Sequence, residues 1–172
     1  KETLTLCPSS ISLAGAEIEL VSLLSRENRL KYAISEVQDD YDYIFIDCPP
    51  SLGLLTLNAL TAADTVLVPI QCEYFALEGL SQLMDTVKLV QKHLNRNLKV
   101  EGVVLTMFDA RTKLSVEVQQ EVRKYFKESV YKSYIPRNVR LSEAPSTGQS
   151  IFEYDVRSEG AKAYASLAKE II

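Results

Sequence analysis

The segment from Tyr41 to Gly53 holds residue types that could bind a metal-associated ligand. Its apolar run, Tyr43–Ile46, predicts a buried strand, and Asp47 stands at the carboxyl end of that strand. In open parallel sheets ligands bind at this end, and a carboxylate there can hold magnesium, usually through water. Pro49 cannot continue a strand ladder, and Gly53 allows the backbone to approach a ligand closely. An aspartate that closes a local turn explains the same residues.

Polar residues follow other apolar runs in the same way. Glu73 comes after the run Thr65–Ile70 and could contact a ribose, a partner subunit or water. Arginine suits phosphate because its guanidinium is always charged and can bind two oxygens. Scattered solvated cations are the alternative. The basic residues in these loops are Arg111, Lys113, Arg137 and Arg140.

Composition narrows the class of protein. Apolar residues make up 47% of the 172 residues and charged residues 24%, which is ordinary for a globular domain. The net charge of −4 gives no sign of a polybasic protein, although a local basic patch is compatible with that sum. No uninterrupted apolar window of about 18 residues predicts a membrane span. The three widely spaced cysteines argue against a zinc site or a disulfide framework and suit a reducing cytosol.

The elements that must position these residues alternate along the chain. Short, continuously apolar runs predict buried strands at Leu4–Cys7, Tyr41–Cys48, Thr65–Ile70, Val100–Met107 and Val130–Ile135. Helical spacing is found at Leu13–Leu24, Glu27–Val37, Leu54–Ala62, Leu77–Leu94, Leu114–Phe126 and, with Ser158 as its cap, Ser158–Ile172. This order predicts an α/β fold, a three-layer α/β/α sandwich with a largely parallel sheet. One domain over residues 1–172 is expected, with a long irregular stretch at Pro136–Asp155.

Five passages of the sequence resemble, in order, motifs of the ParA/Soj family of chromosome and plasmid partition ATPases. The resemblance covers nearly the whole chain and is near to the chromosomal Soj branch. The passages are Leu13–Leu20, Asp47–Thr56, Gln71–Tyr74 with Ala76–Ser81, Leu105–Thr112 and Ile135–Pro145.

The resemblance implies a role for particular residues. Asp47 matches the Walker B aspartate, which would contact magnesium through water. Pro49 begins the second switch, which ends at Gly53. Glu73 matches a position facing the nucleotide of a dimer partner. The residues matching the loop against the adenine are Pro136, Arg137 and Asn138, with Met107 nearby. Those matching contacts to DNA phosphates are Arg111 and Arg140.

The same resemblance implies cofactors and partners. ATP or ADP with magnesium is expected, together with an ATP-dependent homodimer that binds DNA without sequence preference. A ParB-type (Spo0J-like) partner would stimulate hydrolysis. The expected location is the cytoplasm, associated with the nucleoid and not with a membrane.

One family feature is missing from the sequence. A P-loop reads G-x-x-x-x-G-K-[ST], and none of the six glycines is followed by lysine. We therefore expect the P-loop strand and helix, and the catalytic residues, upstream of Lys1, so that the chain is the C-terminal two-thirds of an NTPase domain. On this expectation the chain alone does not hydrolyse ATP. A non-enzymatic DNA-binding or regulatory module is one alternative, and a MinD-type division-site ATPase is another.

Overall fold

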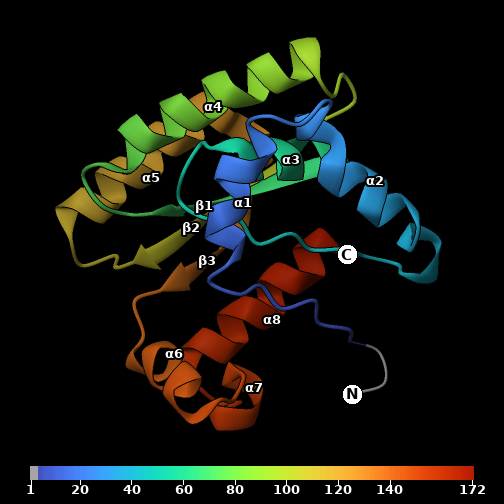
Figure 1. The fold of residues 1–172 in the computed structure, drawn as a ribbon. Coiled ribbons are helices and arrows are strands. Elements are labelled where there is room, and N and C mark those ends of the chain that lie inside the picture. Colours follow the sequence, from blue (N-terminus) through green and yellow to red (C-terminus); the bar gives the residue numbers. More distant parts are fainter. Residues whose placement is uncertain (1–3) are drawn as a thin grey trace. The chain divides into compact units, whose positions relative to one another are not determined.

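The computed structural model describes residues 4–172, which form helices and a parallel three-stranded sheet. The chain divides into two compact units. Unit 1 comprises the residues up to Asp64 together with Thr86–Leu98, and unit 2 comprises Thr65–Asp85 and Lys99–Ile172. Each unit is described by itself, with the elements labelled as in Figure 1.

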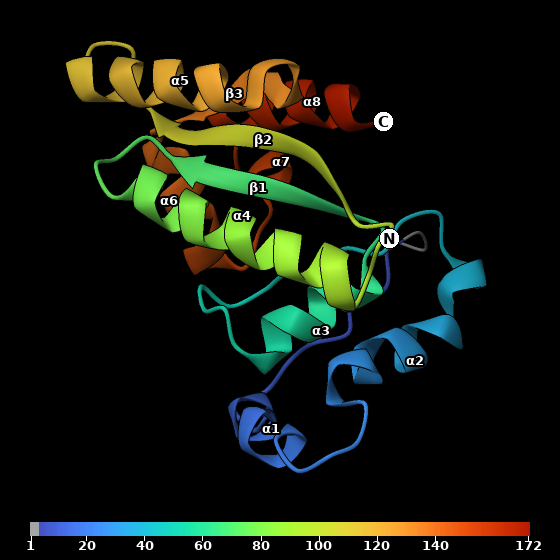
Figure 2. The ribbon, with the colours of Figure 1, turned by 90° about the horizontal axis from the view of Figure 1, so that it is seen from above.

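Unit 2 contains the sheet. Its strands are β1 (Thr65–Gln71), β2 (Lys99–Phe108) and β3 (Val130–Pro136), in the order β1-β2-β3. Both pairings are parallel, and the arrowheads of β1 and β2 point the same way in Figure 2. All three carboxyl ends therefore lie at one edge of the sheet. The prediction of an α/β fold with a parallel sheet is confirmed.

Side chains of β2 alternate between two cores because successive residues of a strand point to opposite faces. Val103 and Leu105 join a cluster with Val118 and Val122 of α5 (Lys113–Phe126) and with the beginning of α4 (Ala76–His93). Val104, between them, packs instead in a cluster that contains α8 (Glu159–Ile171). Helices thus cover both faces of the sheet in unit 2 (Figure 1).

Local signals set the helix boundaries in unit 2. The Thr112 hydroxyl accepts a hydrogen bond from the backbone N–H of Ser115 at 3.4 Å and caps α5. The Ser158 hydroxyl accepts from the N–H of Ala161 at 3.1 Å and caps α8, so this predicted cap is confirmed. Such caps satisfy N–H groups that have no partner within the helix.

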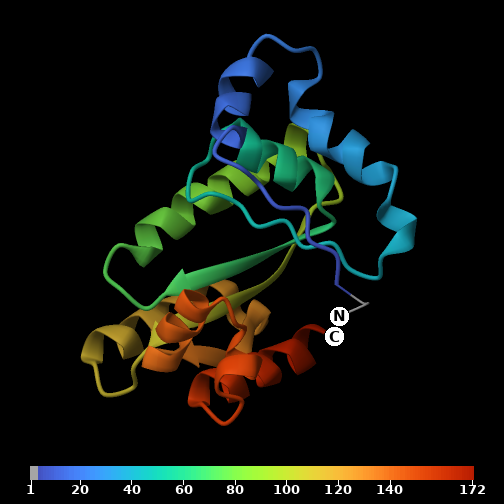
Figure 3. The same cartoon turned by 60° about the horizontal axis from the view of Figure 1, so that its bottom comes forward.

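The prediction of an irregular stretch at Pro136–Asp155 is wrong, because most of these residues are helical. It contains α6 (Val139–Glu143), a 3₁₀ turn (Ala144–Thr147) and α7 (Ile151–Tyr154). Ser150 and Glu153 form a capping box at the start of α7. Gly148, with φ 68°, ends the 3₁₀ turn in a left-handed conformation. Figure 3 shows this orange segment beside the red helix α8.

Besides the second half of α4, unit 1 is built from short helices. They are α1 (Leu13–Leu20), α2 (Arg29–Ser35) and α3 (Leu54–Ala62), with 3₁₀ turns at Arg26–Asn28 and Gln38–Asp40. The helix predicted at Leu54–Ala62 is confirmed. The predicted helices Leu13–Leu24 and Glu27–Val37 are too long. Within the described residues, no helix is long and apolar enough to cross a membrane.

Two predicted strands are absent from the described part of unit 1. Leu4–Cys7 and Tyr41–Cys48 are extended or irregular chain without ladder pairing. Leu4 and Phe45 are largely exposed, at 80% and 78%. A strand is stabilised by hydrogen bonds to a neighbour and by a covered face, and the described residues supply neither to these apolar runs. The apolar composition of these two runs therefore predicted strands that the described structure does not contain.

Glu170 of α8 covers backbone donors on β3, an edge strand among the described residues. Its carboxylate accepts hydrogen bonds from the backbone N–H groups of Lys132 and Ser133, both at 2.8 Å. The Ser133 hydroxyl also donates to it. These bonds, led by that of the hydroxyl, lower the pKa of Glu170. Unpaired N–H groups on an edge strand invite pairing with another chain, and this carboxylate occupies two of them.

Replacing Glu170 by glutamine is expected to lower the free energy of unfolding at neutral pH by about 1 kcal/mol, a modest value because the side chain is exposed. Its folded pKa lies below the unfolded value, so the stabilisation is present above the unfolded pKa and is lost as the pH falls through the folded pKa. Urea unfolding of wild type and variant should therefore converge on acidification. Glu128→Gln, an exposed acid before β3, is the control. A pH-independent difference would contradict the prediction.

Candidate functional site

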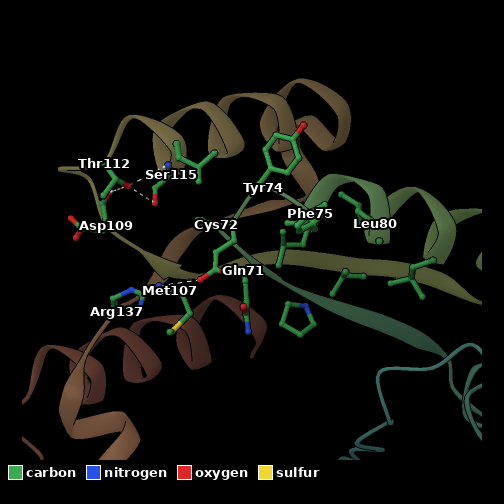
Figure 4. A pocket seen from close by; sticks show the side chains of 18 residues that line it. Gln71, Cys72, Tyr74, Phe75, Leu80, Met107, Asp109, Thr112, Ser115 and Arg137 are labelled. Carbon is green, nitrogen blue, oxygen red and sulfur yellow. Dashed lines mark hydrogen bonds and ion pairs between the residues drawn. The ribbon is translucent and has the colours of Figure 1, made fainter.

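The carboxyl ends of β1 and β2 open into a pocket of about 850 Å³ in unit 2. Figure 4 shows Tyr74 and Phe75 on one side of it, Asp109 and Thr112 on another, and Met107 with Arg137 on a third. The loops after both strands and the beginnings of α4 and α5 supply the walls. The lining residues are Val68–Ala76, Gly79, Leu80, Leu83, Met107, Asp109, Thr112, Leu114, Ser115 and Arg137.

Three of the residues predicted to serve a nucleotide meet at this pocket. Glu73 follows β1, Met107 lies near the end of β2, and Arg137 follows β3. The Arg137 guanidinium donates a hydrogen bond from Nη2 to Glu73 Oε1 at 3.0 Å. Because β2 lies between β1 and β3, this ion pair spans the end of the central strand. Residues 64 positions apart are thereby joined at one edge of the sheet.

Met107 has an unusual backbone. Its φ is 53°, in the left-handed region that side chains other than glycine rarely adopt. The pairing of β2 with β3 is irregular between Leu105 and Phe108, which surrounds this residue. Such strain costs on the order of 1–3 kcal/mol and is found most often at functional sites. The conformation places the thioether among the pocket residues (Figure 4).

Pro136 and Asn138 have structural positions beside the pocket. Pro136 ends β3 opposite Phe108 of β2. The Asn138 side chain accepts a hydrogen bond from the backbone N–H of Arg140 at 2.9 Å and caps α6. Neither belongs to the described residues that line the pocket. The predicted adenine loop is therefore divided, with only Arg137 and Met107 facing that space.

Cys72 lines the pocket but is not suited to nucleophilic chemistry. Its side chain is buried, and burial raises the pKa of the thiol to about 11. The thiolate is the nucleophilic form of cysteine, and it is scarce at neutral pH when the pKa is so high. Cys72 instead packs with β1 and β2 in the main cluster of unit 2.

The loop after β2 holds a tight ion pair between Asp109 and Arg111. Arg111 donates to the carboxylate from Nε at 2.9 Å, from Nη2 at 2.7 Å and from its backbone N–H at 3.0 Å. These bonds, led by that of the side chain, lower the pKa of Asp109 to about 2. The arginine side chain remains 89% exposed. Arg111 is thus open to solvent while its guanidinium is engaged.

Asp47 and Pro49 lie in unit 1, on the exposed segment before α3. The described residues contain no group of three or more histidine, cysteine or acidic side chains that could hold a metal. A single accessible carboxylate suits magnesium that is held mainly through water, since this ion keeps much of its hydration. Asp47 therefore fits a water-mediated magnesium contact. The described residues offer no closed metal cage.

Sequence reasoning missed the carboxylates that hold the candidate arginines. Asp109, two residues before Arg111, lies in a passage used only for the family resemblance, and no pairing role was predicted for it. Glu143 lies three residues after Arg140, a spacing that brings side chains together on a helix, and this signal was available. Asp155 lies 15 residues from Arg140, and only folding reveals that they are close.

The chain shares sequence and fold with known proteins. The family model of the AAA domain, AAA_31, matches residues 1–100. The sporulation initiation inhibitor protein Soj of Bacillus subtilis is 65% identical over 170 residues, which are 99% of this chain and 67% of that protein. The chromosome partitioning protein ParA of Myxococcus xanthus is 55% identical over 169 residues, 98% of this chain and 60% of that protein.

A solved structure with a similar fold contains a nucleotide. Cobyrinic acid a,c-diamide synthase from Mycobacterium smegmatis, with bound ADP and magnesium, is 40% identical, with a TM-score of 0.77. The match covers 94% of this chain and 59% of that one. The chain thus spans about three-fifths to two-thirds of the length of these three proteins.

The parallel sheet, its helices and these neighbours define the class as an α/β fold of the P-loop NTPase type. Within that class, the identity of 65% to Soj over nearly the whole chain is decisive. The chain belongs to the Soj/ParA family of chromosome-partitioning ATPases.

Proposed function

We propose that this protein acts in DNA partitioning as an ATPase. It binds ATP or ADP with magnesium, dimerises when ATP is bound and attaches to DNA without sequence preference, and a ParB-type partner stimulates hydrolysis. The observation that carries the proposal is the 65% identity to Soj over 99% of the chain. The named relatives favour this function over that of a MinD-type division-site ATPase. Cytoplasmic location with attachment to the nucleoid is part of the proposal.

The proposal assigns the nucleotide to the carboxyl edge of the strands. Met107, Arg137, Pro136 and Asn138 serve the base, and Glu73 faces the nucleotide of the second protomer. The pocket that Glu73, Met107 and Arg137 share supports this assignment. The ADP and magnesium bound in the solved neighbour support the choice of cofactors. Asp47 contacts magnesium through water and Pro49 belongs to the switch that follows it. When bound, magnesium would stabilise phosphate charge.

The proposal assigns DNA contact to Arg111 and Arg140. Both follow strand ends in unit 2, and their side chains are 89% and 55% exposed. An exposed guanidinium can meet a phosphate through two parallel hydrogen bonds. Such contacts give affinity without reading base sequence, which is what a protein that attaches anywhere along DNA requires.

Arg111→Ala and Arg140→Ala are each expected to weaken DNA binding roughly tenfold, because each removes a charged hydrogen-bond donor to phosphate. The salt dependence of log K should become shallower by about 1 per lost contact. Fluorescence anisotropy with duplexes of two unrelated sequences, in ATP and magnesium and at two salt concentrations, measures both effects. The protein is used at its natural length.

Arg96→Ala is the matched control, since Arg96 is exposed and precedes β2 rather than following a strand. Unchanged DNA binding by both test variants would remove their assigned role. ATP hydrolysis, measured in parallel, separates the proposal from the alternative of a non-enzymatic DNA-binding or regulatory module. That alternative predicts DNA binding that is independent of nucleotide and of Asp47→Ala, with no ATP hydrolysis.

A further inference from the structure

Arg140 is held by side chains from two short helices and the residue that follows them. Its Nη1 donates to Glu143 Oε2 at 3.0 Å, and its Nε lies 3.7 Å from Asp155 Oδ2. The Tyr154 hydroxyl donates to the same Glu143 oxygen at 3.1 Å. Arg140 and Glu143 belong to α6, Tyr154 ends α7, and Asp155 caps α7. We call Glu143, Tyr154 and Asp155 the Arg140 clamp.

The clamp pairs with two of the three guanidinium nitrogens with which Arg140 would bind a phosphate. A guanidinium binds an oxyanion in a bidentate manner through two N–H groups of its fork. Here carboxylates face both Nε and Nη1. Arg111, in the loop after β2, is also paired, because Asp109 accepts hydrogen bonds from its Nε and Nη2. Both proposed DNA contacts are thus paired with acids of their own chain.

The exposure of the clamp makes its ion pairs exchangeable. The side chains of Arg140, Glu143 and Asp155 are 55%, 41% and 35% exposed. Ion pairs in such surroundings are weak and are screened by salt. Phosphate can therefore displace them, but only in competition with the acids. A fully buried pair would not open in this way.

We propose that the Arg140 clamp is an autoinhibitory contact: Glu143, positioned by Tyr154, and Asp155 compete with DNA phosphate for the Arg140 guanidinium. This inference rests on the proposed function, because it assumes that Arg140 contacts DNA. Binding requires the guanidinium to exchange carboxylate oxygens for phosphate oxygens. The clamp lowers the affinity of Arg140 for DNA phosphate and so favours release of the DNA.

Two variants open the clamp in different ways. Glu143→Gln removes the charge that pairs with Arg140, whereas Tyr154→Phe changes no charge and removes only the hydroxyl that positions Glu143. Both are expected to bind a mixed-sequence duplex more tightly than wild type, by about two- to fivefold, the range of exposed ion pairs. Anisotropy titrations in ATP and magnesium, with the protein at its natural length, measure the change.

Two controls separate the clamp from a general effect of charge. Glu159→Gln removes an exposed acid that pairs with Lys162 rather than with Arg140, and it should change the affinity less than Glu143→Gln. In the Arg140→Ala background, Glu143→Gln and Tyr154→Phe should no longer tighten binding, since the group they release is absent. Persistent tightening in that background would overturn the clamp.

The failures of the two proposals are distinguishable. If wild type binds DNA and Arg140→Ala weakens it, but Glu143→Gln and Tyr154→Phe bind as wild type does, the clamp is overturned and the proposed function stands. If neither wild type nor any variant binds DNA, with or without ATP, the DNA-binding part of the proposed function is overturned, and the clamp is overturned with it. If Arg140→Ala binds as wild type does, Arg140 is no phosphate contact and the clamp is again overturned.

Discussion

Replacing Leu105 by alanine is expected to lower the free energy of unfolding by about 2–5 kcal/mol, the range for truncation of a buried leucine. Leu105 is 1% exposed on the central strand β2 and packs in the cluster with Val118 and Val122 of α5. Its loss removes apolar area and leaves a cavity where neighbouring strands restrict collapse. Urea unfolding followed by circular dichroism measures the change.

Leu89→Ala is the matched control for this prediction. The same atoms are removed from a side chain of α4 that is 60% exposed, so the cost should stay within about 0.5 kcal/mol. Met107, two residues after Leu105, lines the pocket. The Leu105 variant should therefore also disturb the candidate site, as seen in nucleotide affinity. Similar costs for both leucines would show that β2 is not the centre of the core.

Asn58→Ala is expected to cost about 2–4 kcal/mol, because it leaves backbone groups of unit 1 without partners. Asn58 is buried in α3 at 4% exposure. Its Oδ1 accepts from the N–H of Leu30 at 3.1 Å, and its Nδ2 donates to the carbonyls of Arg26 and Leu54, both at 2.9 Å. One side chain thus ties the beginning of α2 and the 3₁₀ turn before it to α3. Urea unfolding measures the total loss.

Hydrogen exchange gives the local measurement for the same prediction. The Leu30 amide should exchange faster in Asn58→Ala, since the Oδ1 acceptor is gone. Asn58→Asp keeps an acceptor for Leu30 but turns a carboxylate toward two carbonyl oxygens, and should be destabilised as well. Asn97→Ala, at an exposed position, is the control with little expected effect. Unchanged protection of Leu30 would contradict this account of unit 1.

Short-range signals predicted many of the elements correctly. Leu54–Ala62 is a helix with the predicted bounds, and the Ser158 cap of α8 is present. Such features depend on residues within a few positions of one another, so they can be read along the chain. The three strands of unit 2 were also predicted, because continuous apolar runs suit a sheet covered on both faces.

Predictions that depended on a distant neighbour were less successful. Tyr41–Cys48 has the composition of a buried strand, but no described residue pairs with it. The stretch Pro136–Asp155 was predicted as a loop because of its prolines and glycine. The capping box of Ser150 and Glu153 was nevertheless present in the sequence. The sequence therefore contained a signal for a helix that the prediction did not use.

The sequence by itself determined the family, through motifs in order along the chain, and the residue types at each strand end. Only the tertiary structure decided which of these residues meet. Glu73 reaches Arg137 across the end of β2, and Arg140 reaches Asp155 between two short helices. The physical reason is that parallel strands bring loops from distant positions to one edge of a sheet. Motif spacing does not encode which loops meet at that edge, and it does not show that Asp155 pairs with Arg140.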